Sequence, residues 1–393
     1  MNKIKKKNVS YDFNLYKCCG CEICADICPT KAIVMKEDRE GFKYPIIDND
    51  KCINCGKCLR ICPIRKSTFR VSKYEKPQAF AVKHKNDNTR IESRSGGIFT
   101  ALSDIVLDNN GVIYGCILNE KFEAIHCRAD NRKIRDLMRG SKYVQSSMKR
   151  IVNQVIEDLK NNKTVLFTGT ACQVQGIRQA VPIKLQKNLL LIDIVCHGVP
   201  SPKIWKEYLN YIANKYNGKI TAVDFRNKKE YGWKEHIESI EVNGIRHDSK
   251  VYTNLFYNHV IIRPTCFKCP YKNFNRPGDI TIADFWGIDD AVCGFNDNKG
   301  VSLVLINNNT GREYFEKSKN DIIFEPVELE KTLQPPLRSN FIEPSNRKRF
   351  WKIYSNKGFD EAIKFYGIIR KSSIRDKIRI KLKNLINRVK AGN

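Results

Sequence analysis

The residues that point most clearly to a chemistry are eight cysteines near the start of the chain. They form the phrase C-x-x-C-x-x-C-x-x-x-C-P twice, at Cys18, Cys21, Cys24 and Cys28 and again at Cys52, Cys55, Cys58 and Cys62. This doubled phrase is the ligand pattern of two-cluster bacterial ferredoxins, in which thiolates hold two 4Fe-4S cubanes. It predicts that the protein carries electrons one at a time.

The spacing also predicts which cysteines share a cluster. Three cysteines at i, i+3 and i+6 on a tight loop can face one cubane, whereas the fourth, beside a helix-breaking proline, ligates the other. We therefore expect one cluster at Cys18, Cys21, Cys24 and Cys62, and a second at Cys52, Cys55, Cys58 and Cys28. Cys19 fits neither set, and we expect it to ligate no cluster. Zinc also binds Cys-x-x-Cys pairs, but it takes four ligands and not eight in this crossed order.

Composition limits the class of protein. The chain has 393 residues, which is enough for two or three domains with a sizeable core. Its 16 cysteines favour metal ligation in a reducing compartment over a secreted disulfide scaffold. The basic N-terminal segment contains no apolar stretch typical of a signal peptide, and no run approaches a membrane span. We expect a cytoplasmic protein, with peripheral contact at the inner membrane face left open.

The net charge of +28 favours anionic partners. Bound clusters would offset part of it, because an oxidised cubane with four thiolates carries about −2. The remaining excess suits an anionic cofactor, an acidic electron carrier or an acidic membrane face. Nucleic acid is the weakest partner class, since no recognised binding motif accompanies the charge.

The pattern of apolar residues predicts how the chain is organised. We expect a ferredoxin domain at residues 1–66, an α/β domain in two parts at 77–160 and 161–340, and a basic helical tail at 345–393. The ferredoxin part should contain short strands at 30–35 and 44–48. In the larger domain, apolar runs alternate with amphipathic segments, which favours a parallel or mixed sheet. Strands are expected at 78–83, 111–118, 124–128, 164–167 and 189–195, helices at 98–107 and 151–160, and further strands within 220–242 and 279–306.

Four more cysteines lie in predicted loops. Cys172 and Cys196 each follow an apolar strand, and Cys266 and Cys269 form another Cys-x-x-Cys. Loops at the carboxyl ends of strands often gather a site. From spacing alone, a third metal site and four separate buried thiols are about equally supported.

Six short motifs follow one another in the larger domain: SGG at 95–97, RGSKYVQS at 139–146, TGTACQ at 168–173, CHGVPSP at 196–202, RPTCFKC at 263–269 and GDITIADFWG at 278–287. In type and order this series resembles the family of coenzyme F420 hydrogenase/dehydrogenase beta subunits, across about residues 76–337. The resemblance implies an oxidoreductase subunit that binds FAD and a 4Fe-4S cluster and passes electrons between them. It also implies that Cys172, Cys196, Cys266 and Cys269 ligate this third cluster. Arg94 departs from the family pattern and would favour flavin phosphates if it faces them.

The resemblance directs the search for a flavin site to polar loops. SGG before a helix offers backbone N–H groups at a positive helix end, and basic or hydroxyl side chains can bind phosphates. The expected residues are Ser95, Gly96, Gly97, Arg139, Ser141, Lys142, Tyr143, Thr168, Gly169 and Thr170. No G-x-G-x-x-G accompanies them, so a Rossmann mode is not indicated. Flavin contacts and structural roles stay open for Asp279, Asp284 and Trp233; His197 is more simply a structural donor than a cluster-tuning residue. No residue is expected to act as general base or nucleophile.

Three functions remain open from the sequence. The first passes electrons between a two-electron carrier such as coenzyme F420 and the clusters through FAD, with a hydrogenase, dehydrogenase or ferredoxin as redox partner. The second is a ferredoxin-dependent reductase of another metabolite, such as one related to polysaccharide. The third is an electron-transfer subunit without flavin. The tail repeats apolar residues at helical spacing between 374 and 389 with basic residues opposite. This pattern suits a lipid surface, and equally docking on the chain's own body or on a partner subunit; the simplest interpretation is a solvated terminal helix.

Overall fold

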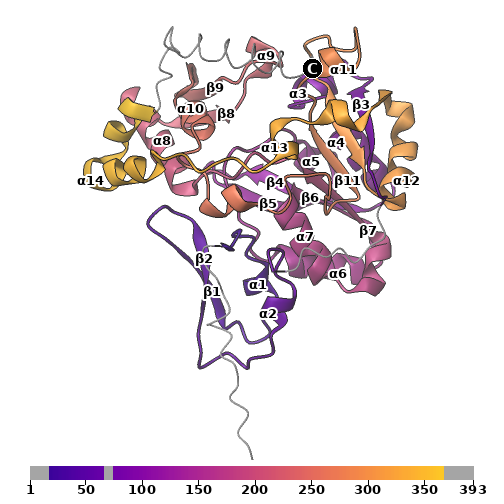
Figure 1. Ribbon diagram of the computed structural model, residues 1–393, viewed down its shortest axis with the longest axis horizontal. Helices are drawn as coiled ribbons and strands as arrows, with labels where there is room; N and C mark the ends of the chain where they lie inside the picture. The colour runs from indigo at the N-terminus through magenta and orange to yellow at the C-terminus, as the bar shows by residue number, and fades with distance from the viewer. Residues whose placement is uncertain (1–16, 66–73, 367–393) are drawn as a thin grey trace, which may run out of the picture.

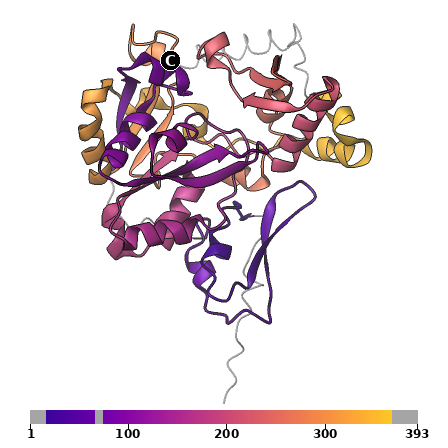
Figure 2. The same cartoon turned by 180° about the vertical axis from the view of Figure 1, so that it is seen from behind.

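The computed structural model describes residues 17–65 and 74–366. A small module, residues 17–65, lies below the rest of the molecule in Figure 1, and the view from behind in Figure 2 shows the same separation. Above it lie a large mixed sheet with helices on both faces and a smaller three-stranded sheet with its own helices. The expected fold, a ferredoxin-like module followed by a larger α/β part with a mixed sheet, is confirmed.

The small module is a hairpin facing two single-turn helices. β1 (Ile33–Glu37) pairs antiparallel with β2 (Lys43–Ile47), and α1 (Ile23–Asp26) contacts α2 (Lys57–Arg60). Both strands were predicted. The first begins three residues later than expected, because the turn after Cys28 continues through Thr30 and Lys31 adopts a left-handed conformation at φ 55°.

The large sheet has eight strands in the order β13-β3-β12-β11-β7-β6-β4-β5. The four central strands β11, β7, β6 and β4 run parallel to one another, and the outer pairs are antiparallel. The strands are β3 (Gln78–His84), β4 (Val112–Leu118), β5 (Ala124–Ala129), β6 (Val165–Thr170), β7 (Leu189–Ile194), β11 (Ile280–Asp284), β12 (Ser302–Ile306) and β13 (Ile322–Val327). All but β13 fall in segments that the sequence predicted to contain strands.

Helices cover both faces of this sheet. α6 (Ile151–Lys160) and α7 (Ala171–Ala180) pack on one face with Val112 and Tyr114, while α4 (Ile98–Asp108) and α12 (Asn309–Ser318) pack on the other with Ile113. Successive residues of β4 therefore enter opposite cores, as expected for a strand buried on both sides. The carboxyl ends of β6, β7 and β11 meet at the same edge.

The strands predicted between residues 220 and 242 belong to a separate sheet. β8 (Ile220–Asp224), β9 (Glu238–Val242) and β10 (Ile245–Ser249) form an antiparallel meander in which β9 is central. The sheet packs on α8 (Pro202–Lys215), α10 (Val251–Tyr257) and α14 (Arg347–Tyr366), the last interrupted at Gly358. The remaining α-helices are short: α3 (Asp87–Glu92), α5 (Arg132–Asp136), α9 (Lys228–Tyr231), α11 (Ile288–Ala291) and α13 (Pro335–Arg338).

The predicted basic tail is described only as far as α14. Its periodic apolar residues between 374 and 389 lie outside the described residues. Within 17–65 and 74–366, none of the helices combines the length and apolar character needed to cross a bilayer.

The small module is attached to the larger part by polar contacts, some of them buried. Asp26 at the end of α1 accepts hydrogen bonds from the backbone N–H groups of Arg150 (2.7 Å) and Val152 (3.2 Å), at the N-terminus of α6. Its carboxylate thus satisfies helix donors that would otherwise lack partners. Arg347 forms a buried ion pair with Glu40, and the Tyr271 hydroxyl donates to the carbonyl oxygen of Pro63 (2.5 Å). These contacts fix the cysteine loops relative to the large sheet.

Candidate functional site

The first predicted cluster set lines one cavity. Cys18, Cys21, Cys24 and Cys62 surround a space of about 320 Å³ together with apolar residues such as Ile23, Met35 and Ile61. Burial raises the pKa of the Cys18 thiol, and the positive charge of Arg263 opposes this rise. Cys62 comes from the second phrase, so the structure brings together the crossed set that the spacing predicted. Sulfur donors around an apolar cavity suit an iron–sulfur cluster.

The second predicted set lines a smaller pocket at the far end of the module. Cys28, Cys52, Cys55 and Cys58 surround it with Ile33 and Ile47. Cys58 packs against Cys24 and Cys28 in one apolar cluster, so the two cysteine sets adjoin each other. Cys55 is exposed, as are the neighbouring side chains of Ile53 and, on the hairpin, Val34 and Ile46. This end of the module therefore faces solvent with an apolar surface.

The third set gathers from segments far apart in the sequence. Cys196 and Cys269 lie in loops as expected, but Cys172 lies in the first turn of α7 and Cys266 in a short 3-10 helix at Pro264–Lys268. Burial raises the pKa of Cys196 to about 12, with further contributions from the nearby thiols of Cys172 and Cys269. The pKa of Cys266 is raised by burial and by Cys196. Four mutually close thiols are a donor set that fits a third cubane. In the described ranges, no group of three or more His, Cys, Asp or Glu is placed to hold a single metal ion.

Cys19, which the sequence predicted to ligate no cluster, lies between the first and third sets. Its side chain is buried in the same apolar cluster as Cys21 and Cys172. The contact with the Cys172 thiol lowers the pKa of Cys19, but the contact with Cys21 and burial outweigh it, so the pKa is raised well above its ordinary value. Gln145 holds this segment by donating to the carbonyl oxygens of Cys19 (2.9 Å) and Gly20 (3.1 Å). The first set is thus in contact with the third through Cys19.

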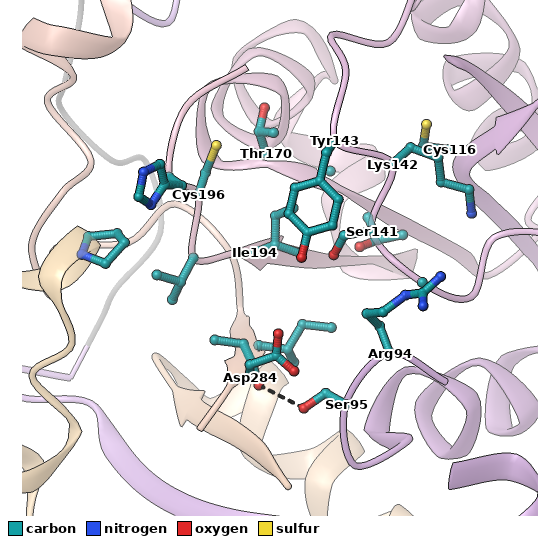
Figure 3. A pocket seen from close by; sticks show the side chains of 18 of the residues that line it. Arg94, Ser95, Cys116, Ser141, Lys142, Tyr143, Thr170, Ile194, Cys196 and Asp284 are labelled. Atoms are coloured by element: carbon teal, nitrogen blue, oxygen red, sulfur yellow. Dashed lines mark hydrogen bonds between the residues drawn. The ribbon is translucent and has the colours of Figure 1, made fainter. Parts of the chain in front are cut away.

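A large cavity opens where β6, β7 and β11 end. Its volume is about 600 Å³, and Figure 3 shows side chains from several loops facing it. Nine of the ten residues predicted for flavin binding line it: Ser95, Gly97, Arg139, Ser141, Lys142, Tyr143, Thr168, Gly169 and Thr170. Cys196 also lines this cavity, so the pocket adjoins the third cysteine set.

Gly96, the tenth predicted residue, has a packing role. Its carbonyl oxygen accepts from the N–H of His84 (2.7 Å), and its own N–H donates to Ser302 Oγ (2.9 Å). A Cβ at this position would lie 2.2 Å from the carbonyl oxygen of Val82 and 2.6 Å from the N of Ser302. Gly96 therefore lets the loop lie against β3 and β12, where it positions Ser95 and Gly97.

The pocket is rich in cations, most of which already have partners. Arg94 pairs with Asp224 at 2.5 Å, and Arg139 pairs with Asp136 at 2.9 Å. Lys142 Nζ donates to the carbonyl oxygens of Leu137 (2.6 Å) and Arg139 (3.0 Å). Burial lowers the pKa of Lys142 to about 8.

Three atoms of pocket-lining residues remain without a hydrogen-bond partner. Arg94 Nε, His126 Nδ1 and Gln334 Oε1 are buried and unpartnered among the described residues. Buried polar atoms are rarely left unpaired in proteins, so these three indicate a polar ligand. Arg94 Nε can donate to a phosphate, whereas Gln334 Oε1 and His126 Nδ1 can only accept, since the other ring nitrogen of neutral His126 donates to the Thr168 carbonyl oxygen. The set fits a ligand such as FAD, which carries phosphates as well as hydrogen-bond donors.

The structure separates the residues whose roles the sequence left open. Asp279 is buried in an ion pair with Arg178 (2.6 Å) and accepts from the N–H of Leu191, which is a structural role. Asp284 lines the pocket, where it accepts from Arg226 (2.7 Å) and from Trp233 Nε1 (2.8 Å).

Of the two remaining open residues, His197 lines the pocket and Trp233 does not. Trp233 is buried behind it and stacks on Trp286, with ring centroids 5.1 Å apart. Trp286, which the sequence did not single out, is the tryptophan that lines the pocket. His197 lines the pocket beside Cys196 and shares a 2.6 Å Nε2–Nε2 contact with His259. Burial lowers the pKa of His197 to about 3. It therefore stays neutral at physiological pH.

Fold and cysteine sets together define an iron–sulfur electron-transfer protein with a ligand pocket beside its innermost set. Residues 17–65 match the family described as 4Fe-4S dicluster domain. Residues 162–332 match the family described as the C terminus of the coenzyme F420 hydrogenase/dehydrogenase beta subunit. The chain thus matches, over these two segments, the two kinds of domain that its motifs predicted, a 4Fe-4S dicluster domain followed by the C-terminal part of an F420 hydrogenase/dehydrogenase beta subunit.

Two curated proteins illustrate the two halves of this match. The chain is 25% identical to the F subunit of the F(420)H(2) dehydrogenase of Methanosarcina mazei over 207 residues, which are 49% of this chain and 58% of the relative. It is 33% identical to NADH-quinone oxidoreductase subunit I 2 of Geobacter metallireducens over 78 residues, 18% of this chain and 60% of the relative. The chain thus spans less than two thirds of either protein.

Among solved structures, the chain is similar to part of the F420-reducing NiFe hydrogenase complex from Methanosarcina barkeri. The similarity covers 75% of this chain and 92% of that chain, with 18% identity and a TM-score of 0.45.

Proposed function

We propose that the protein is an iron–sulfur flavoprotein oxidoreductase subunit. The pocket bound by Ser95, Lys142 and Thr170 would hold FAD, and a two-electron carrier such as coenzyme F420 would exchange electrons with it there. Three 4Fe-4S clusters, at the third, first and second cysteine sets in that order, would connect the pocket to the exposed end of the small module. A flavin supplies the exchange between paired and single electrons when bound.

The observation that carries this proposal is the continuity of the cysteine sets. Cys196 belongs both to the pocket and to the third set. Cys172 of that set contacts Cys19, which contacts Cys21 of the first set. Cys24 of the first set packs against Cys58 of the second. A redox centre in each position would leave no large gap for an electron to cross.

The roles of the protein's own residues follow from their contacts. Arg94 and Lys142 supply positive charge at one side of the pocket, where an anionic cofactor would bind. Trp286 and Tyr143 supply flat apolar surfaces beside which a planar ring can lie. Cys55 and the apolar residues around it would face the redox partner, either a ferredoxin or a hydrogenase or dehydrogenase subunit.

Anaerobic reconstitution tests the cofactor content. We expect about twelve iron atoms per chain, four for each cubane, and one FAD. About eight iron atoms would remove the cluster at Cys172 and Cys196 from the proposal. Absence of FAD after reconstitution would favour the electron-transfer subunit without flavin.

The substrate is tested on the same preparation with two reductants. Reduced F420 should reduce the clusters in the presence of FAD, as the name of the Methanosarcina mazei relative suggests. Reduction by reduced ferredoxin but not by reduced F420 would instead support a ferredoxin-dependent reductase of another metabolite.

A further inference from the structure

Arg263 is a fully buried cation held only by neutral groups. Its Nε donates to the carbonyl oxygen of Cys18 (2.7 Å), one terminal nitrogen donates to Gln145 Oε1 (3.0 Å), and the other donates to the carbonyl oxygen of Lys43 (3.0 Å). The guanidinium carbon lies 4.3 Å from the ring centroid of Tyr44. These contacts give each guanidinium nitrogen a partner but do not balance the positive charge.

The other buried arginines show how unusual this is. In the described part of the chain seven arginines are buried, and six of them pair with a carboxylate. The pairs are Arg90 with Asp297, Arg135 with Asp104, Arg178 with Asp279, Arg226 with Asp284, Arg276 with Asp193 and Arg347 with Glu40. Among these seven, Arg263 alone has no carboxylate in ion-pair contact.

An unpaired buried charge is expensive, and arginine cannot avoid the cost by losing its proton. Such a residue indicates that an anion belongs beside it in the mature protein. The nearest candidate is defined by position, because Arg263 holds the backbone of Cys18, a member of the first cysteine set. A 4Fe-4S cluster bound there by four thiolates would carry about −2 when oxidised and about −3 when reduced.

We infer that Arg263 is the internal counter-cation of the cluster held by Cys18, Cys21, Cys24 and Cys62. This inference rests on the proposed function, since it requires that cluster. Arg263 stabilises the additional negative charge of the reduced state, so it raises the reduction potential of this cluster relative to a neutral surrounding. The first cluster therefore accepts an electron more readily than its ligands alone would allow. It lies midway between the pocket and the exposed end of the module.

The test compares three variants of the full chain after anaerobic reconstitution. Arg263→Gln removes the charge, Arg263→Lys keeps the charge without the forked geometry, and Thr265→Val is a neutral control. Thr265 Oγ1 donates to the same Cys18 carbonyl oxygen (2.8 Å), so the control removes a neighbouring contact without changing charge. The measurement is the midpoint potential of each cluster, from redox titration followed by electron paramagnetic resonance.

For Arg263→Gln, we expect the ratio of reduced to oxidised form of one cluster to fall at least tenfold at a fixed solution potential. That shift corresponds to about 59 mV downward for a one-electron couple. Arg263→Lys should retain most of the original midpoint, and Thr265→Val should retain it fully. If Arg263→Gln loses four iron atoms while Arg263→Lys keeps them, the charge is needed to hold the cluster, and the inference is also supported.

Two results would overturn the inference. One is an unchanged midpoint in a fully loaded Arg263→Gln protein. The other is an equal shift or equal loss of iron in Arg263→Gln and Arg263→Lys, because geometry and not charge would then be responsible. A wild-type chain that takes up no iron would instead defeat the proposed function, which iron analysis distinguishes before any titration.

Discussion

At the scale of single residues, Lys142 is the pocket cation whose charge changes near physiological pH. Burial lowers its pKa to about 8, so without a bound ligand it is protonated below that pH and neutral above it. An anionic phosphate binds the protonated form and favours proton uptake. Affinity for FAD should therefore fall as the pH rises through about 8, by up to tenfold per pH unit.

A Lys142→Met variant checks this dependence in FAD titrations between pH 6.5 and 9.5. We expect about tenfold weaker binding at pH 7 and little further change at higher pH, since one charge-assisted contact is lost. Lys121→Met, at an exposed lysine outside the pocket, should behave like the wild type. A pH dependence that survives in Lys142→Met would assign it to another group.

Cys62 tests the crossed arrangement of the two phrases. It lines the cavity of Cys18 although it belongs to the second phrase. Cys62→Ser should therefore abolish the same electron paramagnetic resonance signal as Cys18→Ser and lower the iron content by about four atoms. Cys293→Ser, at an exposed cysteine outside the three sets, should leave iron content unchanged. Loss of the signal that Cys52→Ser abolishes would show that each phrase binds its own cluster.

What the sequence could predict at this scale depended on how local the information was. The cysteine grouping is encoded in short loops, so the two cavities match the spacing. The contact between Cys19 and Cys172 joins distant parts of the chain, and no local pattern announces it. That Arg263 has no carboxylate partner depends on the positions of all the carboxylates around it, so it can be seen only in the folded structure. Trp286 could have been suggested by its place in the GDITIADFWG motif, but the sequence does not say which of two stacked tryptophans faces the pocket.

At the scale of elements, the loop before α4 depends on close contact with two strands. Gly96→Ala would place a Cβ 2.2 Å from the Val82 carbonyl oxygen, and backbone atoms cannot yield as a side chain can. We expect a loss of about 3 kcal/mol in the free energy of unfolding, together with weaker FAD binding. Urea denaturation and FAD titration measure the two effects.

Gly244→Ala is a matched control for this variant. Gly244 adopts a φ of 79° in a turn, and its Cβ would meet no atom within 4 Å. Its cost should be limited to about 1 kcal/mol from the left-handed backbone, without an effect on FAD. Equal stability losses in the two variants would show that the contact with β3 and β12 is unimportant.

Element types were easier to predict than their partners. The buried strands β6 and β7 and the helix α6 have strong periodic patterns and were found within a few residues. The assignment of β8 and β9 to a separate sheet was not predicted. The Asn243-Gly244 turn that joins β9 to β10 is a local hairpin signal, but it does not say which sheet the hairpin joins, because that depends on packing against distant helices. Strand β13 joins β3 at the sheet edge through a pairing of residues far apart in sequence, which periodicity cannot reveal.

At the scale of the whole molecule, the third cysteine set is the only proposed connection between the pocket and the small module. Cys172→Ser should remove the proposed third cluster and leave the proposed FAD pocket intact. Reduction of the remaining clusters by a two-electron carrier should then fall to the rate seen without FAD, while dithionite still reduces them directly. Stopped-flow absorbance measures both rates, with Cys293→Ser as the control. Unimpaired reduction through FAD would show that electrons reach the module by another path.

The exposed position of Cys55 has a practical consequence for handling the protein. Oxidants attack thiolates and their bound iron more readily where these are more accessible. The second cysteine set, at the outer end of the small module, is the most accessible of the three sets, because it contains the exposed Cys55. Damage by oxygen should begin there and proceed inward. A sample purified in air would lose its outermost iron first, and with it the ability to deliver electrons to a partner, while the buried centres still accept them.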